Sequence, residues 1–452
     1  MKKKMTAAFM ATMLMVTSLA GCASKNQETT SDNSSSAAVS NESNEKQETV
    51  TLTVWRQKMT DERTSLIKSL NDQFMKENPN IKIEFTAMPD SFDQKLDLAL
   101  ANGSGPDVIV SPTNLSPLIE NEYVIPLDDL YDNWSGKDNM VTSMVDSIRG
   151  IDIKENKLYG IPEGANINCL WIRPDWFKAA GIDIPATWDD VFNDIEKLTD
   201  ASKDQYGVGL RGGQGSAANL EMMMFSYAGI TDYFDSNGKC TIRDPKMVEF
   251  VSRWLGQYGK YSAEGDIGNG WTELAATFQS GRSAVIQHNL GSASGHMTAF
   301  NSDSSKFEAI PFPKSVDGTV VNPPLTYSAT CISSTCKNVD AAFKYITWIS
   351  SGDANSSRCE LWSELPVDKT VLENADWIKN TTWMKMGAET LLSADTKFYS
   401  SPAYLPSYGS ILTNDVEPMV QAVMSGDMTA QEMCDNWATL IEQAKAEADA
   451  EK

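Results

Sequence analysis

Aromatic and hydrogen-bonding side chains stand at the expected ends of strands and in the loops that follow them. The aromatic candidates are Trp55, Trp171, Trp271, Trp362 and Tyr408. The polar candidates are Arg56, Asp90, Asn114, Glu163, Asn166, Arg211, His288 and Asn289. A ring that covers about 100 Å² of apolar surface contributes roughly 2.5 kcal/mol, and amide or charged groups beside it can pair with hydroxyls. This combination suits a ligand with apolar faces and hydroxyl edges, which is the chemistry of a sugar.

Each candidate also has a structural alternative. An aromatic ring can pack in a core, as we expect for the helical tryptophans Trp188, Trp254, Trp348 and Trp437. Trp55 can simply close the first strand, and a polar residue at a strand end can cap a helix or face solvent. The carboxylate of Asp107, in a Gly-Pro-Asp turn, can cap backbone amides.

Catalytic and metal-binding signatures are absent from the sequence. It has no G-x-S-x-G elbow, no Walker A loop, no H-E-x-x-H and no G-x-G-x-x-G that opens a helix. His288 and His296 are the only histidines, which makes a histidine-rich metal site impossible. The cysteines beyond Cys22 are widely and irregularly spaced, which favours buried free thiols, although the possible disulfide pairings stay open. We therefore expect no catalytic residue, no metal and no cofactor.

Hydrophobic periodicity places the candidates on alternating strands and helices. Strands are expected at 51–55, 81–87 and 107–111, separated by helices from Thr60 and from Ser91, where Gln94 completes a capping-box spacing. This alternation predicts a parallel sheet covered on both faces, with ligands beyond the carboxyl ends of its strands. The pattern restarts after Pro162. Further strands are expected at 170–173, 206–211, 283–287, 307–313 and 330–333, and helices at 188–198, from 245, at 272–279, at 339–350 and through most of the tail.

The first 22 residues carry an export signal. Lys2, Lys3 and Lys4 precede an apolar run that is too short to span roughly 30 Å of hydrocarbon. The sequence Leu19-Ala20-Gly21-Cys22 resembles the lipobox of bacterial lipoproteins, in which the cysteine is acylated; the alternative is an ordinary cleaved signal. Residues 22–49 are polar and without apolar period, so we expect a lipidated cysteine and a disordered tether that reaches roughly 30 Å.

Composition limits the partners of the mature chain. Removal of the three signal lysines takes the formal charge from −23 to −26, and such an acidic surface repels nucleic acids and anionic lipid heads. We interpret the acidity as solubility of an exposed protein. About 400 residues after the tether are more than one core normally serves, so two lobes are expected.

Several segments, in order, resemble the substrate-binding lipoproteins of bacterial ABC importers, specifically the sugar-binding family that includes maltose-binding protein. The matching segments are Ile81-Lys82-Ile83-Glu84 with Phe92-Asp93-Gln94-Lys95-Leu96, Gly103-Ser104-Gly105-Pro106-Asp107-Val108-Ile109, Tyr159-Gly160-Ile161-Pro162, residues 177–182 before Thr187-Trp188-Asp189-Asp190, residues 278–285, and Leu365-Pro366-Val367-Asp368-Lys369. Trp171-Ile172-Arg173-Pro174-Asp175 departs from the family, which usually has a strand end richer in tyrosine and asparagine.

The resemblance implies an α/β, two-lobed periplasmic-binding-protein-like fold, with two doubly wound sheets joined by a multi-stranded hinge. It implies a signal peptide at 1–21, an N-lobe at 50–162 and 309–352, and a C-lobe at 163–308 and 353–452. The expected function is a non-enzymatic receptor, a monomer held by its lipid on the extracytoplasmic face of the cell membrane. It captures a carbohydrate, an oligosaccharide or a related sugar, and passes it to a membrane permease. The alternatives are a receptor for a polyol, peptide or other solute, a secreted carbohydrate-active enzyme and an adhesive surface lipoprotein.

Overall fold

The computed structural model describes residues 49–88, 91–152 and 154–450. The predicted signal peptide, Cys22 and all but the last residue of the tether lie outside the described residues, as does the candidate Asp90.

The N-lobe contains a six-stranded sheet with the order β11-β4-β10-β3-β1-β2. Its strands are β1 (Val50–Gln57), β2 (Ile81–Met88), β3 (Val108–Val110), β4 (Ile161–Asn166), β10 (Thr326–Ile332) and β11 (Leu365–Pro366). β1 is parallel to β2 and β3, whereas β10 is antiparallel to β3 and β4. The sheet is therefore mixed rather than wholly parallel, because β10 returns from the other lobe.

The C-lobe contains a four-stranded sheet with the order β6-β7-β5-β8. Its strands are β5 (Asn168–Ile172), β6 (Tyr206–Val208), β7 (Ser283–Asn289) and β8 (Glu308–Ile310). A separate parallel pair joins β9 (Val320–Asn322) to β12 (Thr396–Phe398). Alternation along β5 sends Cys169 and Trp171 to one face of the sheet and Leu170 and Ile172 to the other.

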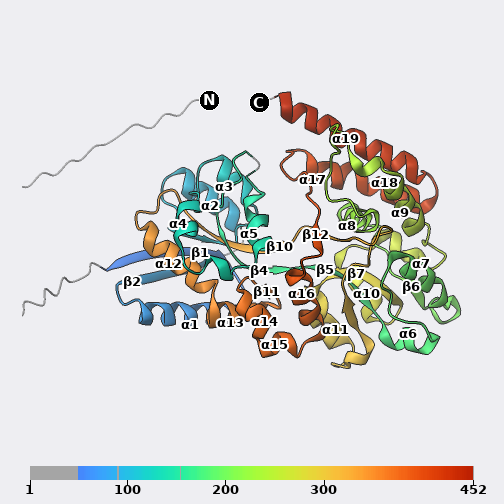
Figure 1. The fold of residues 1–452 in the computed structure, drawn as a ribbon, viewed down its shortest axis with the longest axis horizontal. Coiled ribbons are helices and arrows are strands. Elements are labelled where there is room, and N and C mark those ends of the chain that lie inside the picture. Colours follow the sequence, from blue (N-terminus) through green and yellow to red (C-terminus); the bar gives the residue numbers. More distant parts are fainter. Residues whose placement is uncertain (1–48, 89–90, 153, 451–452) are drawn as a thin grey trace, which may run out of the picture. The chain divides into compact units, whose positions relative to one another are not determined.

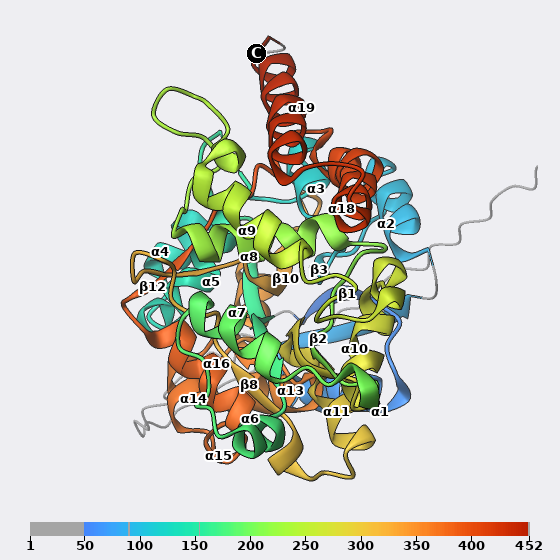
Figure 2. The same ribbon diagram turned by 90° about the vertical axis from the view of Figure 1, so that its right-hand side faces the viewer.

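Helices cover both sheets (Figure 1). Those of the N-lobe and of the following connection are α1 (Asp61–Glu77), α2 (Phe92–Ala101), α3 (Ser116–Glu120), α4 (Asp128–Asn133), η1 (Lys137–Asn139), α5 (Thr142–Arg149), α12 (Val339–Ile349), α13 (Gly352–Trp362), α14 (Lys369–Asn374) and α15 (Asp376–Lys379). Those of the C-lobe are α6 (Pro174–Ala180), α7 (Trp188–Lys197), η2 (Ala201–Lys203), α8 (Ser216–Ala228), η3 (Thr241–Arg243), α9 (Pro245–Leu255), η4 (Glu264–Gly268), α10 (Trp271–Gln279), η5 (Leu290–Ser292), α11 (Ala293–Ala299), η6 (Ser304–Lys306), α16 (Thr382–Leu392), α17 (Tyr408–Ser410), the π-helix η7 (Ile411–Val416), α18 (Glu417–Ser425) and α19 (Ala430–Ala450). Figure 2 shows α18 and α19 beside each other over α8 and α9.

The chain crosses between the two sheets at three places. Only Ile167 separates β4 of the N-lobe from β5 of the C-lobe. The chain returns between β8 and β10, and it leaves the N-lobe for the last time after β11. The sequence-based segments 309–352 and 353–452 differ from this sheet membership, since β8 pairs in the C-lobe through Ile310 and β11 pairs with β4.

Local sequence signals explain the helix starts in part. Thr187 caps α7 and shares a capping box with Asp190, as its position predicts. The capping box expected at Ser91 is wrong, because Ser91 adopts a left-handed backbone with φ 66° and its side chain does not cap α2. Within the described part of the chain, no helix is both long and apolar enough to cross a membrane.

The cysteines of the folded body are buried and unpaired, as the spacing predicts. Cys169, Cys240, Cys331, Cys336, Cys359 and Cys434 are all free thiols. Burial raises the pKa of Cys331, Cys359 and Cys434 to about 12. These thiols therefore stay protonated and unreactive in the native protein.

Candidate functional site

A hollow of about 530 Å³ lies between elements of both lobes. Asn114, α3 and α5 form its N-lobe wall, the segment 324–327 forms its floor, and residues 398–404 form the opposite wall. A second hollow of about 300 Å³ shares Asn114, Leu325 and Tyr327 with the first. We call the two together the Tyr327 hollow.

The lining of the Tyr327 hollow combines rings with hydrogen-bonding groups. Tyr327, Phe398 and Tyr404 supply aromatic surface, and Ser143 and Asn114 supply polar atoms. The Ser143 hydroxyl oxygen is buried and has no hydrogen-bond partner in the protein, so a donor or acceptor that reaches it would stabilise it. Burial raises the pKa of Tyr327 to about 12, which keeps its hydroxyl protonated and able to donate.

Three C-lobe candidates lie together at the start of α10. Trp271 is 39% exposed, the Arg211 guanidinium carbon lies 5.4 Å from the centre of the Trp271 ring, and the His288 ring lies against that ring at 3.4 Å between centres. His288 Nε2 is 3.3 Å from the Trp271 carbonyl oxygen, so a protonated Nε2 donates to it. Burial lowers the His288 pKa to about 4, so the imidazole is neutral at pH 7.

The loop that carries Arg211 is shaped around its side chain. Arg211 Nε donates to the Gln214 carbonyl oxygen at 2.7 Å. Gly215 has φ +77°, and a Cβ atom there would lie 2.0 Å from an Arg211 nitrogen, so only glycine fits. The Gly215 N–H donates to Glu417 at 2.6 Å, which fastens this loop to the start of α18.

Two candidate asparagines meet near the first crossing. Asn166 ends β4, and Asn289 ends β7. A Cβ atom on Gly291 would lie 3.2 Å from Asn289 Oδ1 and 3.9 Å from Asn166 Oδ1, so both amides border this glycine. Asn166 Oδ1 is buried and accepts no hydrogen bond from the protein. An unpartnered acceptor of this kind is stabilised by a donor from a ligand or water.

Arg56, Glu163 and Trp362 lie together, but in a buried network of the N-lobe. Glu163 is fully buried between Arg56, at 3.3 Å, and Arg358, at 2.7 Å, and it also accepts from Thr330. Arg358 pairs with Glu364 at 2.8 Å. Burial acts to raise the Glu163 pKa, but the two arginines outweigh it and hold this pKa below its usual range. Both carboxylate oxygens of Glu163 are thus engaged by protein groups inside the N-lobe.

Trp362 was expected in a C-lobe loop, and this is wrong. It ends α13 of the N-lobe, is only 9% exposed, and lies 5.3 Å from the Arg56 guanidinium carbon and 4.7 Å from that of Arg63. Cation–π contacts with arginines account for its position.

Two further aromatic candidates are corrected by the structure. Trp171 has no exposed surface; it packs against His296 and its indole donates to the Asn289 carbonyl oxygen. Strand alternation turned its side chain into the core. Tyr408 points its hydroxyl at Glu221, 2.8 Å away, inside the C-lobe. Trp55 is half-buried two residues before the end of β1.

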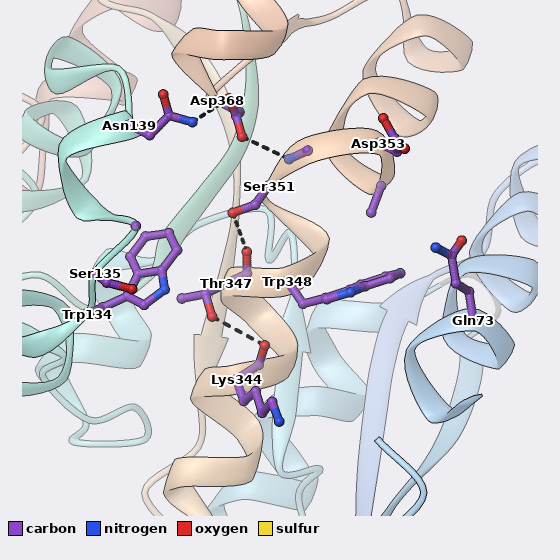
Figure 3. A pocket seen from close by; sticks show the side chains of 13 residues that line it. Gln73, Trp134, Ser135, Asn139, Lys344, Thr347, Trp348, Ser351, Asp353 and Asp368 are labelled. Carbon is purple, nitrogen blue, oxygen red and sulfur yellow. Dashed lines mark hydrogen bonds between the residues drawn. The ribbon is translucent and has the colours of Figure 1, made fainter. Parts of the chain in front are cut away.

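Another hollow, of about 570 Å³, lies on the N-lobe beside α12 (Figure 3). Trp134 and Gln73 stand on opposite sides of the helix in this view, with Trp348 and Thr347 between them. Several of its polar groups bond to the protein: Asp368 accepts from Asn139 at 2.7 Å and from the Gly352 N–H at 2.8 Å, and Ser351 donates to the Thr347 carbonyl oxygen. These contacts cap helices, so we do not assign a ligand to this hollow.

Sequence reasoning missed Tyr327, Phe398 and Tyr404. Phe398 and Tyr404 frame a stretch rich in serine and proline, 398–404, and Tyr327 follows Pro323-Pro324. Aromatic residues next to proline and serine in loop-forming stretches are the sequence signal that could have identified these three residues as site candidates. Only the tertiary structure brings them opposite Asn114.

Comparisons with known proteins agree with this architecture. Residues 57–355 match the sequence profile of the family described as bacterial extracellular solute-binding protein. The putative ABC transporter periplasmic-binding protein YcjN of Escherichia coli K12 is 23% identical over 332 residues, which cover 72% of this chain and 75% of that protein.

Solved structures show the same fold. The sugar-binding protein MalE of Xanthomonas citri has a TM-score of 0.73 at 15% identity, over 88% of this chain and 98% of MalE. An ABC transporter solute-binding protein of Thermotoga lettingae, bound with α-D-tagatose, has a TM-score of 0.66 at 20% identity, over 88% of this chain and 100% of that one.

Proposed function

The chain belongs to the bacterial extracellular solute-binding protein family, and from this premise we propose that it captures a carbohydrate for an ABC importer. The observation that carries the proposal is the Tyr327 hollow, which offers aromatic rings and hydrogen-bonding groups from both lobes. Rings cover the apolar faces of a sugar, while Asn114 and the unpartnered Ser143 hydroxyl suit its hydroxyl groups. The named ligands of structural relatives, such as tagatose, support the same class.

The remaining polar candidates extend the proposed site. Asn166, Asn289, Arg211 and Trp271 lie at the crossing and on the C-lobe, and we propose that they contact the ligand there. Because both lobes then hold the sugar, a closed arrangement gains contacts that an open one lacks, and binding favours closure.

We propose no catalytic step. Asp146 is the one carboxylate among the described residues that line the Tyr327 hollow, whereas most glycoside hydrolases use a pair. Incubation with an oligosaccharide should therefore leave its chain length unchanged, as measured by chromatography.

A thermal-shift screen tests the ligand class. Maltose, tagatose and mannitol are natural first probes, followed by longer oligosaccharides and by peptides. A true ligand at 100 times its dissociation constant should add about 2.7 kcal/mol to the free energy of unfolding. If no sugar moves the transition and a peptide does, the carbohydrate proposal is wrong and the solute-binding role remains.

We also propose a lipid anchor at Cys22 and delivery of the solute to a membrane permease by a monomer. The Leu19-Ala20-Gly21-Cys22 sequence and the polar segment after it support the anchor. Cys22→Ser should release the protein from washed membranes, as measured by immunoblotting of membrane and soluble fractions. Equal retention of both proteins would rule the anchor out.

A further inference from the structure

A buried carboxyl group lies behind one wall of the Tyr327 hollow. Glu221, in α8, is 3% exposed. The hydroxyl groups of Tyr233, Tyr399 and Tyr408 lie 2.7, 3.1 and 2.8 Å from its oxygens and donate to them. Among the described residues, no lysine or arginine forms an ion pair with Glu221. Three phenol hydroxyls thus replace the cation that usually accompanies a buried carboxyl group.

Two of the three tyrosines belong to the segment 398–408, whose first part, 398–404, forms the wall. Tyr399 lines the Tyr327 hollow next to Phe398, and Tyr408 ends the same segment, 398–408, before the π-helix. Tyr233 precedes η3 and does not line the hollow. All three hydroxyls donate to the same carboxyl group. Removal of one hydroxyl at a time therefore distinguishes the bonds that hold the segment 398–408 from the bond that holds Tyr233.

The segment 398–408 also has backbone and apolar contacts, since Tyr399 and Leu405 are buried in the C-lobe core. The Tyr399 N–H donates to the Asn322 carbonyl oxygen at 3.1 Å, and the Ser400 N–H donates to that of Thr231 at 2.9 Å. The Tyr399 ring stacks on Phe225 of α8, with ring centres 4.3 Å apart. Beyond β12, the side-chain bonds to Glu221 are therefore the main polar link between 398–408 and α8.

We propose that Glu221 is a positioning residue for ligand binding: it holds the segment 398–408 against α8 and so fixes one wall of the Tyr327 hollow before a ligand arrives. The proposal rests on the proposed function of that hollow. A wall that is already ordered loses less conformational freedom when a ligand binds, so the ligand binds more tightly. Without Glu221, the segment keeps its backbone pairing and ring stacking but loses this polar link, so a ligand must restrict its remaining motion on binding.

Tyrosine-to-phenylalanine variants test the proposal with a matched control. Tyr408→Phe and Tyr233→Phe each remove one hydroxyl that donates to the same carboxyl group, but only Tyr408 belongs to the segment 398–408 that continues from the wall. Affinity is measured by calorimetry with maltose, tagatose and mannitol, and hydrogen exchange of residues 396–408 is measured in the ligand-free protein. Tyr408→Phe should weaken binding about tenfold and speed exchange, while Tyr233→Phe should leave both close to wild type.

Glu221→Gln supplies the second arm. The amide has one acceptor oxygen where the carboxylate has two, so it cannot accept from all three tyrosines. Glu221→Gln should weaken ligand binding at least as much as Tyr408→Phe does. The double variant Glu221→Gln/Tyr408→Phe should bind no more weakly than Glu221→Gln alone, because both substitutions remove the same hydrogen bond between Tyr408 and Glu221.

Two results would overturn the proposal. One is equal loss of affinity in Tyr408→Phe and Tyr233→Phe, which marks a general loss of stability. The other is unchanged exchange of residues 396–408 in both Tyr408→Phe and Glu221→Gln. If the wild-type protein binds none of the probes, the proposed sugar ligand fails, while the exchange measurement still decides whether Glu221 fixes the wall.

Discussion

Trp271 and Trp171 show how one residue type serves two purposes in the C-lobe. Trp271 starts α10, exposes 39% of its surface and rests on Arg211 and His288. Trp171 exposes none, and its ring meets those of His296, Phe307 and Trp383. Truncation of an exposed ring removes ligand contact area, whereas truncation of a buried ring leaves a cavity.

Alanine substitutions separate these roles. Trp271→Ala should weaken sugar binding by about 1 to 3 kcal/mol and leave the unliganded melting temperature nearly unchanged. Trp171→Ala should lower the free energy of unfolding by about 3 to 5 kcal/mol. Calorimetry and urea denaturation on both variants measure the two quantities. A large stability loss with unchanged affinity in Trp271→Ala would return Trp271 to the core.

For single residues, the sequence predicted which side chains lie together better than it predicted their environment. It grouped Arg56, Glu163 and Trp362 with the ligand candidates, and the structure does bring them together, but around Arg358 in the N-lobe. Arg358 and Glu364 follow Glu163 by 195 and 201 positions in the sequence. No local pattern predicts an ion network assembled over such separations.

Single elements followed their local signals more closely. The 3.6-residue period predicted α1, α7 and α12, and alternation or β-branched runs predicted β1, β2 and β3. The strands β9, β11 and β12 were missed, because each is defined by its distant partner and not by a local pattern. The same limit applies to the wall at 398–404, whose position depends on pairing between β12 and β9.

The 3-10 helix η4 supports the loop that carries Arg211 through one buried carboxyl group. Asp266 accepts from the Leu210 N–H and from Asn269 Nδ2, both at 2.9 Å. Burial raises the Asp266 pKa to about 6, because it disfavours the charged form. The folded protein therefore holds a proton that the unfolded chain releases near pH 4.

This linkage sets the sign of a pH effect. A carboxyl group whose pKa is raised in the folded state contributes stability below its unfolded pKa, and that stability is lost as pH rises through about 6. Wild type should lose about 2 kcal/mol of unfolding free energy relative to Asp266→Asn between pH 4 and pH 7. Urea denaturation of both proteins across this range checks the difference.

Asp200 is the matched control. It lies near the surface, and its hydrogen bond to Lys203 lowers its pKa, so Asp200→Asn should show a difference of the opposite sign. A wild-type advantage over Asp266→Asn that grows from pH 4 to pH 7 would contradict the assignment.

At the scale of the whole molecule, ligand candidates lie on both lobes and at the crossing between them. Asn114 and α5 belong to the N-lobe, residues 398–404 to the far wall, and Asn166 stands one residue before β5. Because Ile167 alone joins β4 to β5, rotation between the sheets changes backbone angles next to Asn166. The ligand contact proposed at Asn166 therefore lies next to the junction between the two sheets.

The buried thiols of the folded body can be used to measure its unfolding by chemical labelling. Six cysteines are distributed over both lobes, none exposes more than 9% of its surface, and all are unpaired. A maleimide reacts with these thiols only when the surrounding structure opens, so the labelling rate reports how often the structure opens. In the Cys22→Ser variant, mass spectrometry should find molecules with either no label or six labels. A bound solute should slow the conversion of unlabelled molecules into fully labelled ones. A single thiol that reacts early, with Cys336 the nearest to the surface, would instead mark local opening, and Cys336→Ser identifies it.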